Sequence, residues 1–177
     1  MNEEEAYSSS FDLYEQAGTK ISGIDWESDP PELIDARLQE AEADLNEAYE
    51  IVNTIQPKPE SAKPSAPYAL RELILGKTVY VSAAREVATA QVHILNAGDA
   101  AAIYQYADWS LEMHAAQENL ELARTRLSVS DTHMDGINMT LVPMDMRSDI
   151  TEAKALNAIF AEHITSLERS VELALES

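Results

Sequence analysis

The chain has 177 residues, with 32 acidic and 12 basic side chains and no cysteine, which gives a formal net charge of −20. A charge of this size excludes a protein that grips nucleic-acid phosphates, because the leading electrostatic term would be repulsive. The missing cysteines exclude disulfides, zinc–thiolate sites, iron–sulfur clusters and thiol nucleophiles.

Two helices are predicted before residue 56. Spaced aromatic and aliphatic residues indicate a shorter helix near 4–21. The motif Asp29-Pro30-Pro31-Glu32 is typical of a helix start, with Asp29 as the cap, proline in the first turn and Glu32 completing a capping box. Over 32–55, apolar residues then alternate at spacings of four and three for three heptads. These seam residues are Ile34, Leu38, Ala41, Leu45, Ala48, Val52 and Ile55.

Four prolines between residues 57 and 67 predict an extended linker over 56–66. A second apolar stripe, which includes Leu70 and Tyr80, then predicts a helix over 67–95. Gly76 lies inside this stripe at a cost of ~1 kcal/mol relative to alanine, which indicates a close helix crossing or a local bend. The motif Asn96-Ala97-Gly98-Asp99 is predicted to end this helix and to cap the next one.

The fourth helix, predicted over 100–127, follows so short a connection that it must be an antiparallel neighbour. The last helix, 149–176, is predicted to open with the capping box Asp149-Ile150-Thr151-Glu152. It carries Asn157 at a seam position, where a polar residue can fix the register. The fourth-helix seam alternates large and small residues: Ala102, Tyr106, Trp109, Met113, Ala116, Leu120, Ala123 and Leu127.

These elements predict an all-α fold. We expect a single domain over 1–177, an antiparallel up-down bundle of four long helices plus a shorter N-terminal helix. No stretch shows clear period-two alternation outside one loop, and no fixed repeat supports an α-solenoid. Nothing approaches the ~18 consecutive apolar residues of a membrane span.

The negative charge is uneven along the chain. Residues 1–56 hold 15 acidic and 2 basic side chains, a net of −13, and residues 57–177 hold the remaining −7. A solvated acidic face or an adaptation to high salt explains this distribution, and so does a docking surface for a basic protein. The leading hypothesis is a non-enzymatic module that acts through protein–protein contact, mainly through its acidic first third.

The segment 128–148 is predicted to be a long loop, and it carries the metal-binding hypothesis. Asp131, His133 and Asp135 match three ligand positions of an EF-hand calcium loop, but the position that needs a glutamate falls on Val142. Four methionines in the loop offer soft ligands for copper(I), although methionine more commonly fills gaps in a core. They are Met134, Met139, Met144 and Met146.

The aromatic residues Tyr80, Tyr104, Tyr106 and Trp109 suggest a second class of function. They could line a small-ligand pocket between helices, as in an extracytoplasmic sensing or solute-binding bundle, although core packing explains them more simply. No E-x-x-H, G-x-S-x-G, P-loop or G-x-G-x-x-G motif occurs. We therefore predict no catalytic residues and no cofactor.

The sequence does not determine the cellular compartment of the protein. The absence of cysteine, the scarcity of lysine and the single N-x-[ST] sequon at Asn138 favour an extracytoplasmic protein. The first residues lack the pattern of a signal peptide, which favours the interior unless a leader has been removed. The oligomeric state is equally open.

Overall fold

A computed structural model describes residues 2–59, 65–140 and 142–176. Within these ranges the chain is all α, as the sequence predicts, and contains no strand. None of the described helices is both long and apolar enough to cross a membrane. The helices are α1 (Glu3–Ser22), α2 (Pro31–Val52), α3 (Ala66–Ala102), α4 (Tyr106–Asp135) and α5 (Met144–Glu176).

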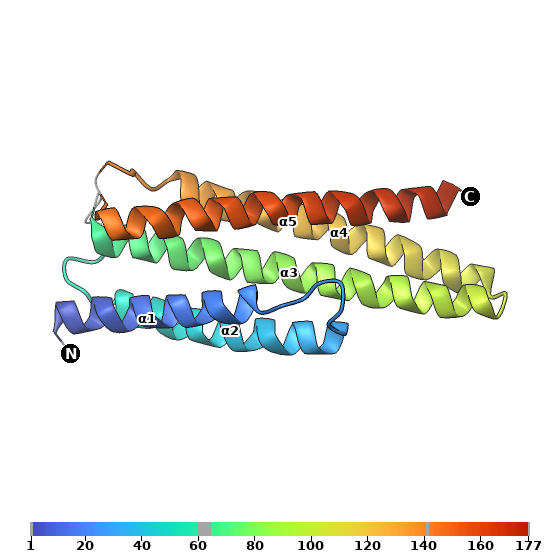
Figure 1. Cartoon of the computed structure of the whole chain (residues 1–177), viewed down its shortest axis with the longest axis horizontal. Helices are drawn as coiled ribbons and strands as arrows, with labels where there is room; N and C mark the ends of the chain where they lie inside the picture. Colours follow the sequence, from blue (N-terminus) through green and yellow to red (C-terminus); the bar gives the residue numbers. More distant parts are fainter. Residues whose placement is uncertain (1, 60–64, 141, 177) are drawn as a thin grey trace.

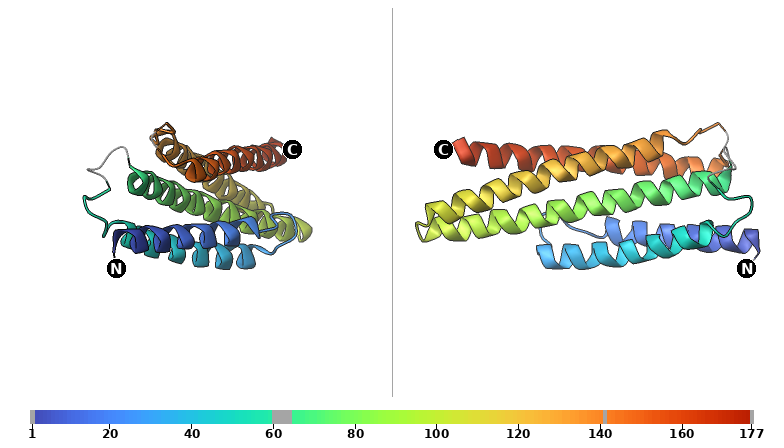
Figure 2. Two further views of the ribbon diagram at one scale, coloured as in Figure 1. Left: turned by 60° about the vertical axis from the view of Figure 1, so that its left-hand side comes forward. Right: turned by 180° about the vertical axis from the view of Figure 1, so that it is seen from behind.

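The helices form an antiparallel bundle around α3 (Figure 1). The α1–α2 hairpin packs on one side of α3, mainly through α2, while α4 packs along the other side and carries α5. Figure 2 shows the same arrangement from behind and obliquely. Because α1 and α2 are shorter than α3, the α3–α4 hairpin extends well beyond them (Figure 1).

The predicted seams form the core. Every predicted seam residue of the second helix is buried, although α2 ends at Val52, before the predicted end, and Ile55 lies in the turn that follows. The α4 seam is buried only from Met113 onward, because nothing covers Tyr106 at the start of that helix. Periodicity therefore identified the core-facing side of each helix, and the exceptions lie at the uncovered end of the α3–α4 hairpin.

A buried polar network joins α3, α4 and α5. The Asn157 side chain donates to Ser130 Oγ at 2.9 Å and to Asp131 Oδ1 at 2.7 Å. Ser130 Oγ in turn donates to the carbonyl oxygen of Gly76 at 2.8 Å. Since a slip of α5 would leave these buried groups unpaired, the network fixes the register of the three helices.

Gly76 marks a close helix crossing, one of the two explanations that the sequence offered. A Cβ atom at this position would lie 2.5 Å from Met134 Cε and 3.4 Å from His133 Cβ. The glycine therefore allows α4 to approach α3 closely.

The predicted end of the third helix at Gly98 is wrong. Helix α3 continues through Gly98 to Ala102, because the alanine-rich segment favours a helix and Ala97 and Ala100 are buried. The turn comes later, at Tyr104, whose φ is +60°.

The predicted loop 128–148 is also shorter than expected. Helix α4 runs on to Asp135, because Ser130 and Met134 are buried, and α5 already begins at Met144. The connection is thus confined to residues 136–143.

Two predicted capping boxes do not form. The N-cap of α2 is Pro30, and the Asp29 carboxylate instead accepts hydrogen bonds from Arg37 and from the amide of Asp25. The predicted box at Asp149 lies inside α5. Of the proline linker, residues 56–59 and 65 are non-helical, and residues 60–64 lie outside the described ranges.

Replacing Gly98 with alanine is expected to stabilise the protein by up to about 1 kcal/mol, since glycine is the poorer helix former. Gly98 is exposed, and no heavy atom lies within 4 Å of the Cβ that alanine would add. The midpoint of urea unfolding measures the gain. Gly76→Ala provides the contrast, because its Cβ would displace the buried Met134 side chain. A Gly98→Ala variant no more stable than the parent would contradict the helical assignment here.

Candidate functional site

Several large hydrophobic side chains are exposed close together at the connection between α3 and α4. Of the eleven large hydrophobic residues that are exposed in the described part of the chain, five lie between residues 95 and 111. All five stand within about two helical turns of the connection between the helices. We call this surface the hairpin tip, and its residues are Leu95, Ile103, Tyr104, Tyr106 and Leu111.

The hairpin tip is exposed because the α1–α2 hairpin stops short of it. The connection between α1 and α2 reaches α3 at Gln91, whose side chain donates to the carbonyl oxygen of Trp26 at 3.3 Å. Helix α3 continues for eleven more residues to Ala102, which is about 16 Å of helix at 1.5 Å per residue. The tip therefore projects well beyond the α1–α2 hairpin, while α5 ends near it (Figure 1).

Tyr104 lies at the turn itself in a strained conformation. Its φ of +60° is in the left-handed region, where a side chain with a Cβ costs roughly 1–2 kcal/mol. Its ring is 78% exposed, so burial does not offset this cost. Residues held in strained backbone conformations cluster at functional sites.

The charge around the hairpin tip is negative. Residues 86–123 contain six acidic side chains and neither lysine nor arginine. One of the six, Glu112, lies 2.6 Å from His93 Nδ1, and this hydrogen bond lowers the pKa of its carboxyl group. Asp99 and Asp108 flank the turn and are exposed. The tip thus combines aromatic and aliphatic side chains with an acidic surround.

Replacing Tyr104 with glycine is expected to stabilise the protein by up to about 1 kcal/mol, because glycine adopts positive φ without strain. Thermal unfolding measures the change. Tyr106→Gly is the matched control: Tyr106 begins α4 without a positive φ, so glycine there should lower stability. A loss of stability in Tyr104→Gly as large as that in the control would show that the ring packs.

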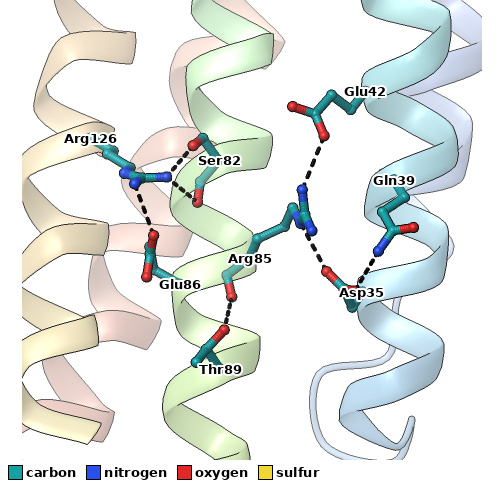
Figure 3. Close-up of polar contacts among 8 residues, drawn as sticks. All are labelled: Asp35, Gln39, Glu42, Ser82, Arg85, Glu86, Thr89 and Arg126. Atoms are coloured by element: carbon teal, nitrogen blue, oxygen red, sulfur yellow. Dashed lines mark hydrogen bonds and ion pairs between the residues drawn. The ribbon is translucent and has the colours of Figure 1, made fainter. Parts of the chain in front are cut away.

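A second surface feature, a groove of about 540 Å³, runs between α2, α3 and α4 and contains two arginines. Arg85 of α3 donates to Asp35 at 2.8 Å and to Glu42 at 3.1 Å, both on α2 (Figure 3). Arg126 of α4 pairs with Glu86 of α3 at 2.9 Å. Both guanidinium groups are therefore neutralised within the protein, and they join helices rather than form an anion site.

The residues of the metal-binding hypothesis lie on the last turns of α4, not in a loop. Asp131 accepts from Asn157, His133 Nδ1 lies 2.9 Å from Glu72, and Asp135 lies 2.6 Å from Lys154 Nζ. Asp131 and Asp135 are four residues apart and both face α5, whereas His133 faces α3, so the three side chains do not converge on one point. No group of three or more candidate ligands gathers among the described residues.

The four methionines of the copper hypothesis lie in unlike surroundings. Met134 and Met146 are buried in the core, Met139 is partly buried and Met144 is 81% exposed. Their distribution fits methionine as a gap-filling core residue.

The residues of the proposed ligand pocket lie far apart. Tyr80 is buried, with its ring centroid 5.0 Å from that of Phe160 on α5. Tyr106 is exposed beyond the end of α3, which lies 22 residues after Tyr80, or about 33 Å along the helix. Trp109 is partly buried against the core. The structure therefore does not bring the three side chains into one pocket.

The sequence contained a signal for the hairpin tip that our prediction did not use. Leu95 and Leu111 lie off the predicted seams, and both fall in the stretch without basic residues.

Comparison with protein-family models, with curated proteins and with solved structures finds no match to this chain, so the interpretation of the site rests on its own residues.

Proposed function

We propose that the protein is a non-enzymatic helical module that binds a basic, amphipathic segment of a partner protein through the hairpin tip. The observation that carries this proposal is the exposure of two tyrosines and three aliphatic residues at a projecting turn. Tyrosine is enriched among the few side chains that supply most of the free energy of an interface, and the aliphatic side chains around it exclude water from the contact.

The acidic first third, which the sequence favoured as the docking surface, lacks such anchors. The seam residues of α2 are buried, and of the large hydrophobic residues described in α1 and α2 only Leu33 is exposed. Some of the acids there are already paired, such as Asp44 with Lys20 at 2.7 Å. The remaining charge attracts a basic partner at long range and speeds encounter, while contact is made at the tip.

The chemistry of the tip favours a basic partner over a second copy of this chain. A contact between two tips would bring together two surfaces whose fixed charges are all negative, from Asp99, Asp108 and Glu112. Lysine or arginine on an amphipathic helix would pair with these carboxylates, and its apolar face would cover the exposed side chains. Such binding should weaken with salt.

Site-specific photo-crosslinking in the native cell tests this proposal. A photoreactive phenylalanine analogue is placed at Tyr104 or Leu111 and, as controls, at Leu33 or Leu122, which are exposed elsewhere. We expect one adduct from both tip positions and from neither control. The crosslinked peptide of the partner should be basic and amphipathic, and the purified pair should dissociate as salt is raised.

Three outcomes contradict the proposal. The first is crosslinking at the control positions as strong as at the tip. The second is an adduct between two copies of this chain. The third is a crosslinked partner segment that is acidic or uncharged, or binding that salt leaves unchanged.

A further inference from the structure

A cavity of about 510 Å³, open to solvent on one side, lies between α1, α3 and α5. It exists because α1 and α5 both lie along α3 without packing against each other over their described residues. Its wall on α1 includes Tyr14 and Gly18, and its wall on α5 includes Ala153 and Leu156. The side chain of Lys77, from α3, lines the cavity between them.

The position of the Lys77 amine is defined by α1. Lys77 Nζ lies 3.6 Å from the centroid of the Tyr14 ring, in a cation–π contact. A Cβ atom on Gly18 would lie 2.9 Å from the same nitrogen, so Gly18 leaves the space that the amine occupies. The ring and the glycine together hold the nitrogen in place.

The surroundings make the neutral form of this amine more accessible than that of an ordinary lysine. Three carboxylates lie near it: Glu15 on α1, and Asp149 and Glu152 on α5. They raise the pKa of Lys77, but burial has the larger effect and lowers it to about 8. Near neutral pH a much larger fraction of Lys77 is therefore a free amine than of an ordinary lysine.

We propose that Lys77 is a reactive amine that condenses with a small, uncharged carbonyl compound bound in the cavity between α1 and α5. The nitrogen lone pair attacks the carbonyl carbon, and the carbonyl oxygen accepts a proton to give a carbinolamine. The carbinolamine then loses water, and the C=N bond forms. The water carries away the carbonyl oxygen and, in net terms, the two protons of the amine. Glu15 or Glu152 can carry the protons.

The walls of the cavity define the class of ligand. Its volume suits a small organic molecule. Three carboxylates oppose an anionic ligand, because no cation other than Lys77 lines the described cavity. The partly buried Leu156, together with Ile159, which is 66% exposed at the open rim, provides apolar contacts for a hydrocarbon body. An uncharged aldehyde with an aromatic or branched aliphatic group fits these conditions.

Reductive trapping tests the proposal. The full chain is treated with benzaldehyde and cyanoborohydride at pH 7.5, and benzylated peptides are quantified by mass spectrometry. The chain has only five lysines, so each site, and the separate N-terminal amine, can be followed. We expect Lys77 to react at least about tenfold faster than Lys20 or Lys154, because more of it is unprotonated.

A charged probe and two variants complete the experiment. 4-Carboxybenzaldehyde should lose the preference for Lys77, because its carboxylate meets Glu15 and Glu152. Lys77→Arg should abolish the fast phase, and Lys154→Arg should leave its rate unchanged. Circular dichroism confirms that both variants fold. Labelling of Lys77 at the rate of Lys154 or slower, or equal preference with the anionic probe, would overturn the proposal.

Discussion

Asn157→Asp is expected to destabilise the protein by about 3 kcal/mol or more at neutral pH, because it buries a charge without a cation to pair with it. Asn157 is 3% exposed, and its amide donates to Asp131 Oδ1 at 2.7 Å. An aspartate of the same shape would place two carboxylates at hydrogen-bond distance. The loss should be visible as a lower midpoint of urea unfolding.

The pH dependence of this loss follows from the sign of the pKa change. Burial and the Asp131 charge should raise the pKa of the new carboxyl group above the ~3.9 of an unfolded aspartate. The destabilisation is then complete above the raised pKa and disappears as the pH falls toward 4. Asn46→Asp, on the exposed face of α2, is the control and should change stability by less than about 0.5 kcal/mol. An equal loss in both variants, or a loss independent of pH, would contradict the role of the network.

The second large effect has the opposite sign, since Lys77→Met is expected to stabilise the protein below pH 8. The pKa of Lys77 falls from 10.5 to about 8 through burial, so the ammonium form is less favourable in the folded state than in the unfolded state. This difference between the folded and unfolded pKa values lowers the free energy of unfolding of the parent protein by at most about 3 kcal/mol. Methionine is unbranched and only one atom shorter than lysine, and it removes the charge.

The advantage of Lys77→Met should depend on pH in a defined window. Lys77 of the parent protein loses its proton at about pH 8 in the folded state and at about 10.5 when unfolded. The parent therefore gains stability as the pH rises through this window, and the difference between the two proteins shrinks. Urea unfolding at pH 7, 9 and 10.5 measures it, with Lys154→Met as the exposed control. A variant less stable than the parent at pH 7 would show that Tyr14 and the three carboxylates outweigh the cost of burial.

The helices and their buried faces could be predicted from the sequence because hydrophobic periodicity is a local signal. The seam from Ile34 to Val52 recurs every three or four residues, so the buried side of α2 follows from helix geometry alone. The structural role of Asn157 could also be predicted from the sequence, because a single polar residue on an apolar seam indicates a specific hydrogen-bond partner.

The helix ends could not be predicted, because they depend on tertiary contacts. Ser130 interrupts the apolar α4 seam with a polar side chain, yet Ser130 and Met134 continue the seam spacing after Leu127, and both are buried against α3. Gly98 has the local signal of a helix stop, but the buried alanines on either side keep the segment helical. Local propensity is weaker than such packing.

The two sites that we propose were only partly visible in the sequence. Lys77 lies four residues after Leu73 and three before Tyr80, so it occupies a seam position where a charge is unexpected. The cavity around it is built by α1 and α5, whose relation to α3 no local pattern reveals. Similarly, the hairpin tip is exposed only because the α1–α2 hairpin ends at the level of Gln91.

The affinity of the purified module for its crosslinked partner is the most direct test of binding at the hairpin tip. The double variant Ile103→Ser, Tyr106→Ser should bind at least about tenfold more weakly, as expected when two anchoring side chains are lost. The control Leu33→Ser, Leu122→Ser removes exposed side chains elsewhere and should bind within about twofold of the parent. Equal affinity of the tip variant and the parent, or equal weakening in the control, would contradict the proposed function.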